Sequence, residues 1–440
     1  MMGQAQKRNR KTLAVIGLGK VGLPLAASLA SSGSLVLGYD TDPNRAELLK
    51  SHDPEQNEIQ HEKRLSQFLT DGVGNLSAVD SIAEAIAASA ISFVIVPTPS
   101  LEDGSFSPSY VEHACFEIGK SLRDKTGDHL VVLVSTVSPG ATADTIVPLL
   151  ERVSGKSCGK GFGFCYSPAL IALGDVIRGF LEPDFAFVGE VDQKGADQLV
   201  DFYSDLFPPG TPLHRMSAQS VEIAKIALNN FLTMKIGFSN LIGRLCDRTP
   251  NANARDVLGA LGDDERIGKK FLNAGMGFGG PCLPRDNAAL CASFGAVGIH
   301  PYLPDAIARC NADHTVQLAM LADDKKKVTV LGLGYKSGTP VTSDSASIAL
   351  CNALIARDRD VCAFDPLAGK MDLHSLHQQV IIASTLGEAL EQAEIIYLTV
   401  DHKTMRNLSI NLPDNARLID VSGGFENVDG SNHVHTFGKH

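Results

Sequence analysis

Apolar runs separated by glycine-rich turns open the chain. Residues 13–19 read LAVIGLG, residues 20–33 have the small and apolar spacing of a helix, and residues 35–40 read LVLGYD. Strands buried on both faces of a parallel sheet appear as continuous apolar runs. The pattern therefore predicts a strand, a glycine turn, a helix and a second strand, the opening unit of an α/β fold with a doubly wound parallel sheet.

The turn between the first strand and the helix has the pattern GxGxxG. Glycines at these positions allow a tight turn, close approach of the backbone to a pyrophosphate, and close packing of helix on strand. A purely structural turn is the alternative. The candidate cofactor contacts here are Gly17, Gly19, Lys20, Val21 and Gly22.

Asp40, at the end of the second predicted strand, indicates which cofactor binds. A carboxylate there accepts hydrogen bonds from both ribose hydroxyls of NAD and repels the 2′-phosphate of NADP. We therefore expect NAD. Arg45, five residues on, is a further candidate contact to the adenosine ribose or phosphate, with an exposed helix arginine as the alternative.

Two more buried strands are predicted in ISFVIVPTP (residues 91–99) and HLVVLVSTVSPG (residues 129–140). Thr98, Ser135 and Thr136 would then lie near the carboxyl ends of these strands, where open α/β sheets bind ligands. Their hydroxyl groups could equally cap the helices that follow. Both interpretations stay open.

The strand and glycine-turn pattern returns late in the chain, at KKVTVLGLGYKSGT (residues 326–339), and a strand ends at Asp365. Between the two copies, residues 217–246 have a long helical pattern that is apolar on more than one side. We expect two Rossmann-like domains joined by a central helical dimerisation segment. The predicted domains are residues 1–209 for NAD, 210–322 for the helical segment with the cysteine loop, and 323–440 for the second Rossmann-like unit.

Composition excludes several classes of protein. The formal net charge of −11 argues against binding to nucleic acid or an anionic membrane, and the one basic run, residues 7–11, is expected to face water. The chain shows neither an apolar span nor a signal peptide, so we expect a cytoplasmic protein. Nine cysteines without a CxxC pair predict neither a metal site nor a disulfide framework.

Cys282 stands apart from the other cysteines, because it follows the glycine-rich stretch GMGFGG. Pro284 is suited to the first position of a helix, which places the thiol at a helix N-terminus. The helix dipole and the nearby Arg285 would both favour the thiolate. A nucleophilic cysteine beside a Rossmann unit suggests oxidation of an aldehyde through a thioester, whereas inert packing is the alternative.

Lys225 and Asn229 are four residues apart on the long predicted helix and so share a face. A lysine within an apolar helix needs a partner or a chemical task. Reaching out to solvent is the alternative for this side chain.

Together these residues resemble the UDP-glucose and GDP-mannose dehydrogenase family, NAD-dependent enzymes that oxidise C6 of a nucleotide sugar from alcohol to carboxylate. The resemblance covers nearly the whole chain. It is carried by GLGKVGLP, VPTP, STVSPG, SPALIALG with PDF, EIAKIALNNF, RIGKKFLNAGMGFGGPCLPRD and LGLGYKSGT. The cysteine loop is the most specific of these segments.

The resemblance implies roles for individual residues. Cys282 would be the nucleophile, Lys225 and Asn229 would hold the C6 oxygen, and Asp286 would assist proton transfer or place a water. Arg266 would reach a nucleotide sugar across a homodimer, and Tyr335 with Lys336 would contact the diphosphate. The remaining substrate contacts that it implies are Ala169, Leu170, Ile171, Phe271, Asn273, Gly275, Phe278 and Gly279. The expected substrate is a UDP-hexose of the UDP-glucose type.

The chain also departs from the family pattern. Ala169 replaces the glutamate expected to activate the water that hydrolyses the thioester, and Leu173 and Phe185 replace frequent acidic and arginine positions. A methyl group cannot accept a proton, so hydrolysis should be impaired, and Ala169→Glu should restore it. Ala169 is either an engineered alanine or natural divergence, and the sequence does not decide between them.

Two other functions remain open. A two-electron hydroxyacid dehydrogenase would share the first Rossmann unit and a helical middle with a lysine, but it would need neither Cys282 nor the second nucleotide-binding pattern. A non-catalytic nucleotide-sugar-binding protein would be consistent with Ala169.

Overall fold

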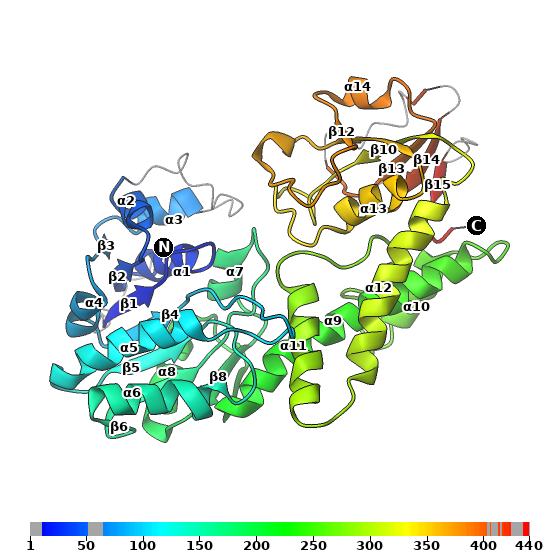
Figure 1. The fold of residues 1–440 in the computed structure, drawn as a ribbon. Coiled ribbons are helices and arrows are strands. Elements are labelled where there is room, and N and C mark those ends of the chain that lie inside the picture. Colours follow the sequence, from blue (N-terminus) through cyan, green and yellow to red (C-terminus); the bar gives the residue numbers. More distant parts are fainter. Residues whose placement is uncertain are drawn as a thin grey trace, which may run out of the picture. The chain divides into compact units, whose positions relative to one another are not determined.

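The computed structural model describes residues 11–51, 65–402, 405, 412–413, 416–423 and 434–439. The chain divides into two compact units, Met1–Ile226 and Ala227–His440, and helix α9 (Ala218–Cys246) crosses this division (Figure 1). Each unit is considered by itself below. Except for Lys11, the basic run at residues 7–11 lies outside the described residues, and the predicted three-domain boundaries stay a prediction.

The first unit is built on a sheet with the strand order β3-β2-β1-β4-β5-β7-β8-β9, with β6 paired to β7. All pairs are parallel except β7 with β8. The strands are β1 (Thr12–Ile16), β2 (Leu35–Tyr39), β3 (Leu76–Ala78), β4 (Ile91–Val94), β5 (Leu130–Leu133), β6 (Ser157–Cys158), β7 (Gly161–Tyr166), β8 (Ala186–Glu190) and β9 (Leu213–Ser217). The order reverses between β1 and β4, where a doubly wound sheet binds its ligand.

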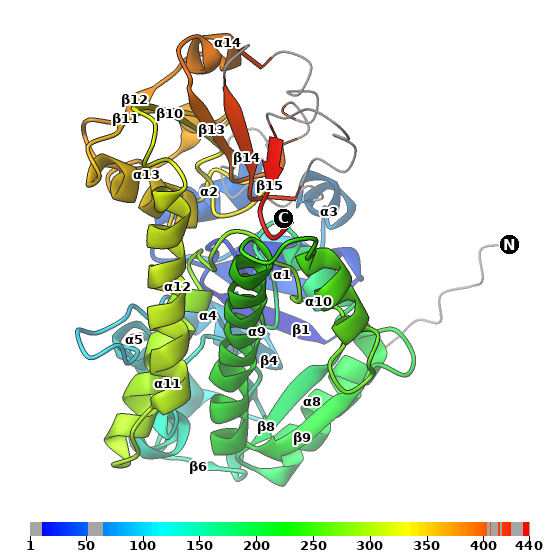
Figure 2. The ribbon, with the colours of Figure 1, turned by 90° about the vertical axis from the view of Figure 1, so that its right-hand side faces the viewer.

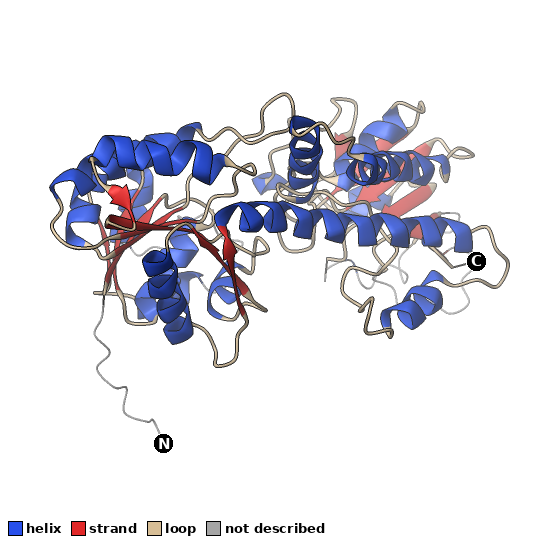
Figure 3. Cartoon of the chain, turned by 90° about the horizontal axis from the view of Figure 1, so that it is seen from below, coloured by secondary structure: helices blue, strands red, loops and turns tan. Residues whose placement is uncertain are grey.

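Helices cover both faces of this sheet (Figure 3). They are α1 (Gly22–Ser31), α2 (Pro43–Ser51), α3 (Leu65–Asp71), α4 (Ile82–Ala88), α5 (Ser109–Asp124), a π-helical turn (Thr142–Ile146) continued by α6 (Val147–Ser154), α7 (Val176–Leu181) and α8 (Gln193–Leu206).

Strand β1 shows why its sequence is continuously apolar. Leu13 and Val15 belong to one buried cluster, and Ala14 and Ile16 belong to the cluster on the other face. Successive side chains of a strand point to opposite faces, so a strand covered on both faces has no solvent-facing position. The predicted doubly wound sheet is confirmed.

The second unit contains an entirely parallel sheet with the strand order β12-β11-β10-β13-β14-β15. Its elements are β10 (Lys327–Leu331), α13 (Ala346–Ile355), β11 (Asp360–Phe364), a 3-10 turn (Ala368–Lys370), β12 (Ile381–Ile382), α14 (Leu386–Leu390), β13 (Ile395–Leu398), β14 (Arg417–Asp420) and β15 (Val434–Thr436). This sheet confirms the second Rossmann-like domain.

Helices precede this sheet in the chain. They are the greater part of α9, then α10 (Ala254–Gly262), α11 (Leu283–Ala296) and α12 (Tyr302–Met320). The helix predicted for residues 217–246 is found as α9, which runs without interruption through 29 residues (Figure 2). The central helical segment is therefore confirmed, whereas a role in dimerisation stays a prediction.

Within the described residues, no helix combines the length and apolar character that crossing a bilayer requires. The same residues contain no group of three or more His, Cys, Asp or Glu side chains suited to a metal ion. None of the nine cysteines, all of which lie in the described part of the chain, forms a disulfide bond.

Candidate functional site

The GxGxxG turn of the first unit has glycines for two different reasons. Gly17 has φ 99°, and a Cβ there would lie 2.0 Å from the carbonyl oxygen of Ile95, while a Cβ on Gly22 would lie 1.9 Å from that of Gly17. The protein itself therefore requires these two glycines. A Cβ on Gly19 would meet nothing within 4 Å. Gly19 leaves open space beside the start of α1, where helix amides favour a phosphate.

Asp40 lies just beyond β2 and faces this turn. Its Oδ2 accepts a hydrogen bond from the Leu18 amide at 2.6 Å, and its Oδ1 accepts one from the Asp42 amide at 2.9 Å. Each carboxylate oxygen can accept a second bond, so a ribose diol can still be received. The turn and this carboxylate fit NAD. The Nε atom of Arg45 lies 3.8 Å from Oδ2 of Asp42, whose side chain is exposed.

The hydroxyl group of Ser135, which follows β5, is hydrogen-bonded to the backbone of Val96, which follows β4. Its Oγ donates to the Val96 carbonyl oxygen at 2.7 Å and accepts from the Val96 amide at 2.8 Å. The hydroxyl proton of Ser135 is therefore donated to Val96, and Ser135 does not cap a helix. Thr98 is buried and Thr136 is half-buried in the same edge of the sheet.

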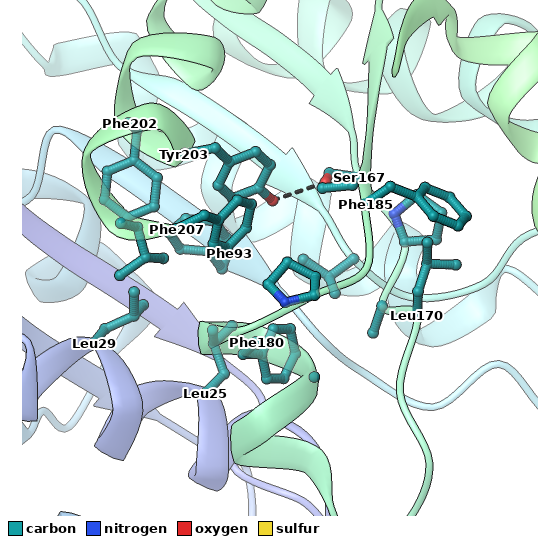
Figure 4. Close-up of a pocket in the computed structure, with 17 residues that line it drawn as sticks. Leu25, Leu29, Phe93, Ser167, Leu170, Phe180, Phe185, Phe202, Tyr203 and Phe207 are labelled. Atoms are coloured by element: carbon teal, nitrogen blue, oxygen red, sulfur yellow. Dashed lines mark hydrogen bonds between the residues drawn. The ribbon is translucent and has the colours of Figure 1, made fainter. Parts of the chain in front are cut away.

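Figure 4 shows an apolar pocket of the first unit. Ala169, which follows β7, is one of the residues that line it. Other parts of the wall are Leu25, Phe93, Phe180, Phe202 and Leu170. Its polar groups are engaged with each other: Ser167 Oγ donates to the Phe187 carbonyl oxygen at 2.8 Å and therefore accepts from the Tyr203 hydroxyl at 2.7 Å. Burial raises the pKa of Tyr203 above its usual value, so Tyr203 stays a phenol.

Phe185 lines the same pocket and packs edge-on against Phe187, with ring centroids 5.1 Å apart. The two positions where the family pattern has a glutamate and an arginine are thus both apolar and share one pocket. Ile171 is half-buried, and its side chain lies against Gly179.

On α9, a carboxylate that the sequence analysis missed lies three residues before Lys225. Glu222 is fully buried and accepts hydrogen bonds from the amides of Gly140 at 2.6 Å and Thr142 at 2.9 Å. Burial raises the pKa of Glu222, although these hydrogen bonds oppose the shift. The sequence signal that could have identified Glu222 is its position as a charged residue in the mainly apolar stretch EIAKIAL. Lys225 is 7% exposed, which does not support the solvent-reaching alternative.

In the second unit, buried amides join α9 to α11. Asn229 Nδ2 donates to Asp286 Oδ2 at 2.6 Å, and the neighbouring Asn230 donates to Asn287. Asp286 is 1% exposed. The structure therefore brings together two residues that the sequence analysis placed in one site from positions 57 apart in the chain.

Cys282 is the N-terminal cap residue of α11, and its carbonyl oxygen accepts from the Asp286 amide at 2.8 Å. Pro284 occupies the second helical position rather than the expected first, because the helix begins at Leu283. Among the nine cysteines, Cys282 is the exposed one. Burial raises the pKa of Cys115 and Cys351 to about 12, so these thiols stay protonated at neutral pH.

The glycine loop before Cys282 is held from one side by side chains of α9 and α12. Asn240 accepts from the Gly275 amide at 2.8 Å and donates to the Met276 carbonyl oxygen at 3.2 Å. Asn311 accepts from the Phe278 amide at 2.9 Å and donates to the Phe278 carbonyl oxygen at 3.0 Å. Each asparagine thus satisfies one backbone donor and one backbone acceptor of the loop.

The loop also packs closely against α12 and against the segment between β10 and α13, which explains its glycines. A Cβ on Gly279 would lie 2.3 Å from the Asp344 carbonyl oxygen, and one on Gly277 would lie 2.6 Å from Asn311 Oδ1. Gly280 has φ 84°, and a Cβ there would lie 2.6 Å from the ring of Tyr335. A larger residue at Gly279 or Gly280 would displace backbone or the Tyr335 ring, and one at Gly277 would displace the Asn311 side chain.

Tyr335 and Lys336 follow Gly332 and Gly334 in the second glycine turn, and Tyr335 lies beside this loop. Burial, with the Cys282 sulfur adding to it, raises the pKa of Tyr335 to about 12. Lys336 Nζ lies 5.5 Å from the centre of the Tyr335 ring. The cysteine loop and the predicted diphosphate contacts therefore belong to one neighbourhood.

Other predicted contacts lie at the surface of the single chain. The Arg266 side chain is 88% exposed and bonded to Asp264 at 2.6 Å. Phe271 is exposed with φ 64°, a conformation rarely adopted by a bulky residue, and Asn273 is exposed as well.

The two Rossmann-like turns differ at the carboxylate that follows the second strand of each. Asp365 is 3% exposed, accepts from the Leu333 amide at 2.7 Å, and lies 3.3 Å from His402 Nε2. Although burial opposes it, the nearby His402 and hydrogen bonds from backbone amides lower the pKa of Asp365. This carboxylate is enclosed, so the second turn does not offer a ribose the acceptor that Asp40 offers.

Comparisons with known proteins agree along the chain. Models of the UDP-glucose/GDP-mannose dehydrogenase family match residues 11–207 (NAD binding domain), 219–313 (central domain) and 329–426 (UDP binding domain). The NAD expected from Asp40 is therefore confirmed as the cofactor.

Individual relatives cover almost the same span. A GDP-mannose 6-dehydrogenase of Pseudomonas syringae pv. tomato is 30% identical over 94% of this chain and 97% of its own. A UDP-glucose 6-dehydrogenase of Haloferax volcanii is 31% identical over 88% of this chain and 91% of its own. The solved structure of a UDP-glucose dehydrogenase from Pyrobaculum islandicum matches with a TM-score of 0.86 at 29% identity, covering 99% of this chain and 98% of that one. The chain belongs to the UDP-glucose/GDP-mannose dehydrogenase family of NAD-dependent nucleotide-sugar dehydrogenases.

Proposed function

We propose that this protein oxidises C6 of a UDP-hexose of the UDP-glucose type from alcohol to carboxylate, with Cys282 as the covalent nucleophile. The observation that carries the proposal is the arrangement around the glycine loop. An exposed thiol at the start of α11 lies one helical turn from Asp286, which is bonded to Asn229. Lys225 lies one turn before Asn229 on the same helix.

The protein's own groups have defined tasks in this reaction. Asn229 and Lys225 hold the C6 oxygen and stabilise negative charge that develops on it. The Cys282 sulfur adds to C6 of the aldehyde, the carbonyl oxygen takes up a proton, and a thiohemiacetal results. NAD, when bound, accepts a hydride in each of the two oxidations. The second oxidation leaves a thioester, whose C–S bond breaks when water adds to C6.

The last step lacks its expected base. Ala169 and its apolar surroundings offer no carboxylate to activate water. Removing a general base slows the step that it serves by about 10²–10⁴-fold. The thioester should therefore persist. Because Ala169 and Phe185 are both apolar in one pocket, natural divergence explains this segment better than a single engineered alanine.

We also propose a homodimer formed through α9. Phe231, Phe238 and Leu245 recur every seven residues and are 55%, 45% and 62% exposed, with Leu241 on the same helix 44% exposed. Contiguous apolar exposure of this kind marks an interaction surface. A second copy of the chain would cover it and would also bring another Arg266 towards the nucleotide sugar.

A single-turnover experiment tests the proposed reaction. The protein is mixed with NAD and UDP-glucose, and NADH release and intact mass are followed together, with GDP-mannose and UDP-N-acetylhexosamines as comparisons. Release of up to two NADH per active site and a mass increase of one nucleotide sugar are expected. Cys282→Ser should release at most the one NADH of the first oxidation and should form no thioester adduct. If no nucleotide sugar yields NADH or an adduct, a binding protein becomes the better account.

A further inference from the structure

A second pair of buried amides joins α9 to α11, next to the pair formed by Asn229 and Asp286. Asn230 Nδ2 donates to Asn287 Oδ1, and Asn287 Nδ2 donates to the Pro304 carbonyl oxygen at 3.0 Å, in the first turn of α12. Both asparagine side chains are buried. Two side chains to which the proposed reaction assigns no task therefore connect three helices of the second unit.

The Pro304 carbonyl group fixes the direction of both hydrogen bonds. A carbonyl oxygen only accepts, so the Asn287 amide presents its Nδ2 to Pro304 and its Oδ1 to Asn230. Asn230 must then donate. If either amide turned over, two acceptors would face each other in a buried site, which is costly. This chain of hydrogen bonds therefore has a single favourable arrangement.

Consecutive residues of each helix form the two contacts between α9 and α11. Asn229 Nδ2 donates to Asp286 Oδ2 at 2.6 Å, and the next residue of each helix forms the second bond. Successive residues of an α-helix point in directions about 100° apart. One hydrogen bond between two helices leaves each free to rotate about it, whereas two bonds in different directions fix both rotation and axial position. The Asn230–Asn287 pair thus holds the register in which Asn229 meets Asp286.

Apolar side chains would be the simpler filling for a contact between two helices. Exchanging a buried, hydrogen-bonded polar pair for apolar groups of similar shape is often neutral or stabilising. The best-attested use of a buried asparagine between packed helices is to specify their register at a cost in stability. Here the register concerns Asn229 and Asp286, which lie one residue before the pair on each helix.

We propose that Asn230 and Asn287 are positioning residues for the oxidation, an inference that rests on the proposed function. They hold α11 in the register at which Asp286 accepts one Nδ2 proton of Asn229 and leaves the other for the C6 oxygen. The same register sets where the start of α11 presents Cys282. Without the pair, α9 and α11 still pack, but Asn229 and Asp286 meet in only part of the molecules.

A double variant removes the pair and keeps the volume of the contact. Asn230→Ala with Asn287→Val has a combined side-chain volume close to that of the two asparagines. Thermal unfolding establishes that it is folded, and Asn230→Val with Asn287→Ala takes its place if it is not. Asn352→Leu is the matched control on α13, because Asn352 also joins two segments of the second unit. Its side chain donates to the Ser375 carbonyl oxygen at 2.9 Å and accepts from the His377 amide at 2.9 Å.

The first measurement is the release of NADH in a single turnover with NAD and UDP-glucose. The rate at saturating UDP-glucose should fall about tenfold in the double variant, because a misplaced group slows the chemical step. The UDP-glucose concentration that gives half of this rate should change by less than about twofold, because Asn240 and Asn311 hold the glycine loop instead. The control should keep both values. A merely structural pair would not separate the rate from this concentration.

The second measurement needs no substrate. Asn229→Ala removes a donor from buried Asp286 and should lower the melting temperature of the wild-type protein. In the double variant the same substitution should lower it by at most about half as much, because fewer molecules then form the Asn229–Asp286 bond.

Three results would overturn the proposal: equal losses of melting temperature in the two backgrounds, an NADH rate that the double variant leaves unchanged, or an equal fall of that rate in Asn352→Leu. If the wild-type protein releases no NADH with any nucleotide sugar, the proposed reaction fails. The two melting-temperature losses would still decide whether the pair positions Asn229 against Asp286.

Discussion

Replacing Ala169 by glutamate places a carboxyl group in the apolar pocket beside Phe93, Phe180 and Phe185. Ala169 is half-buried, and the one polar pair in that pocket, Ser167 with Tyr203, is already hydrogen-bonded. Desolvation should raise the pKa of the introduced carboxyl, by about 1–2 units for a partly buried group. At about 1.4 kcal/mol per unit, the free energy of unfolding should fall by roughly 1.4–2.7 kcal/mol at neutral pH.

The sign of this effect makes it testable. A carboxyl whose pKa is raised on folding binds more protons in the folded state than in the unfolded state between the two pKa values. The penalty is therefore absent below about pH 4, the unfolded pKa, grows as the pH rises through the folded pKa, and is constant above it. Urea unfolding of wild type and Ala169→Glu at a series of pH values between 4 and 8 measures the difference directly.

Ala172→Glu is the matched control, because Ala172 lies three residues on and is exposed. It adds the same group to the same segment without burial, and its stability difference should not depend on pH. If Ala169→Glu behaves like this control, the Ala169 side chain does not face an apolar pocket. The family resemblance predicts that the same carboxyl speeds decay of the thioester adduct, and a faster decay together with the pH-dependent penalty would satisfy both arguments.

Three other outcomes are expected. Cys282 should react with iodoacetamide at neutral pH faster than the buried thiols, and nucleotide sugar should protect it; peptide mapping that finds equal rates would count against its role. NAD should bind more tightly than NADP by about 1.5–3 kcal/mol because of Asp40, and calorimetry showing equal affinities would refute this. Asn311→Asp keeps the acceptor for the Phe278 amide but places a carboxylate against the Phe278 carbonyl oxygen. KM for the nucleotide sugar should therefore rise about tenfold while kcat changes less. A change in kcat alone would contradict the loop's role in binding.

The local sequence pattern alone determined most of the secondary structure and several candidate site residues of this protein. The apolar runs at β1, β4 and β5 are buried almost throughout, so their sequences predict a sheet covered on both faces, whereas β2 exposes Leu35 at its start. The long helix was predicted within one residue of its observed start at Ala218. Cys282, Asp40 and the glycine turns were recognisable because backbone geometry and charge restrict the residue types at such positions.

Tertiary structure decided what each polar group can still do. Asp40 and Asp365 both follow the second strand of a Rossmann-like unit, yet His402, from a distant position in the chain, encloses only Asp365. Glu222 and Ser135 likewise form hydrogen bonds with backbone groups of residues distant in the sequence, Gly140 and Val96. Sequence reasoning identifies the group, but contacts between distant segments determine its partners, its burial and hence its remaining chemistry.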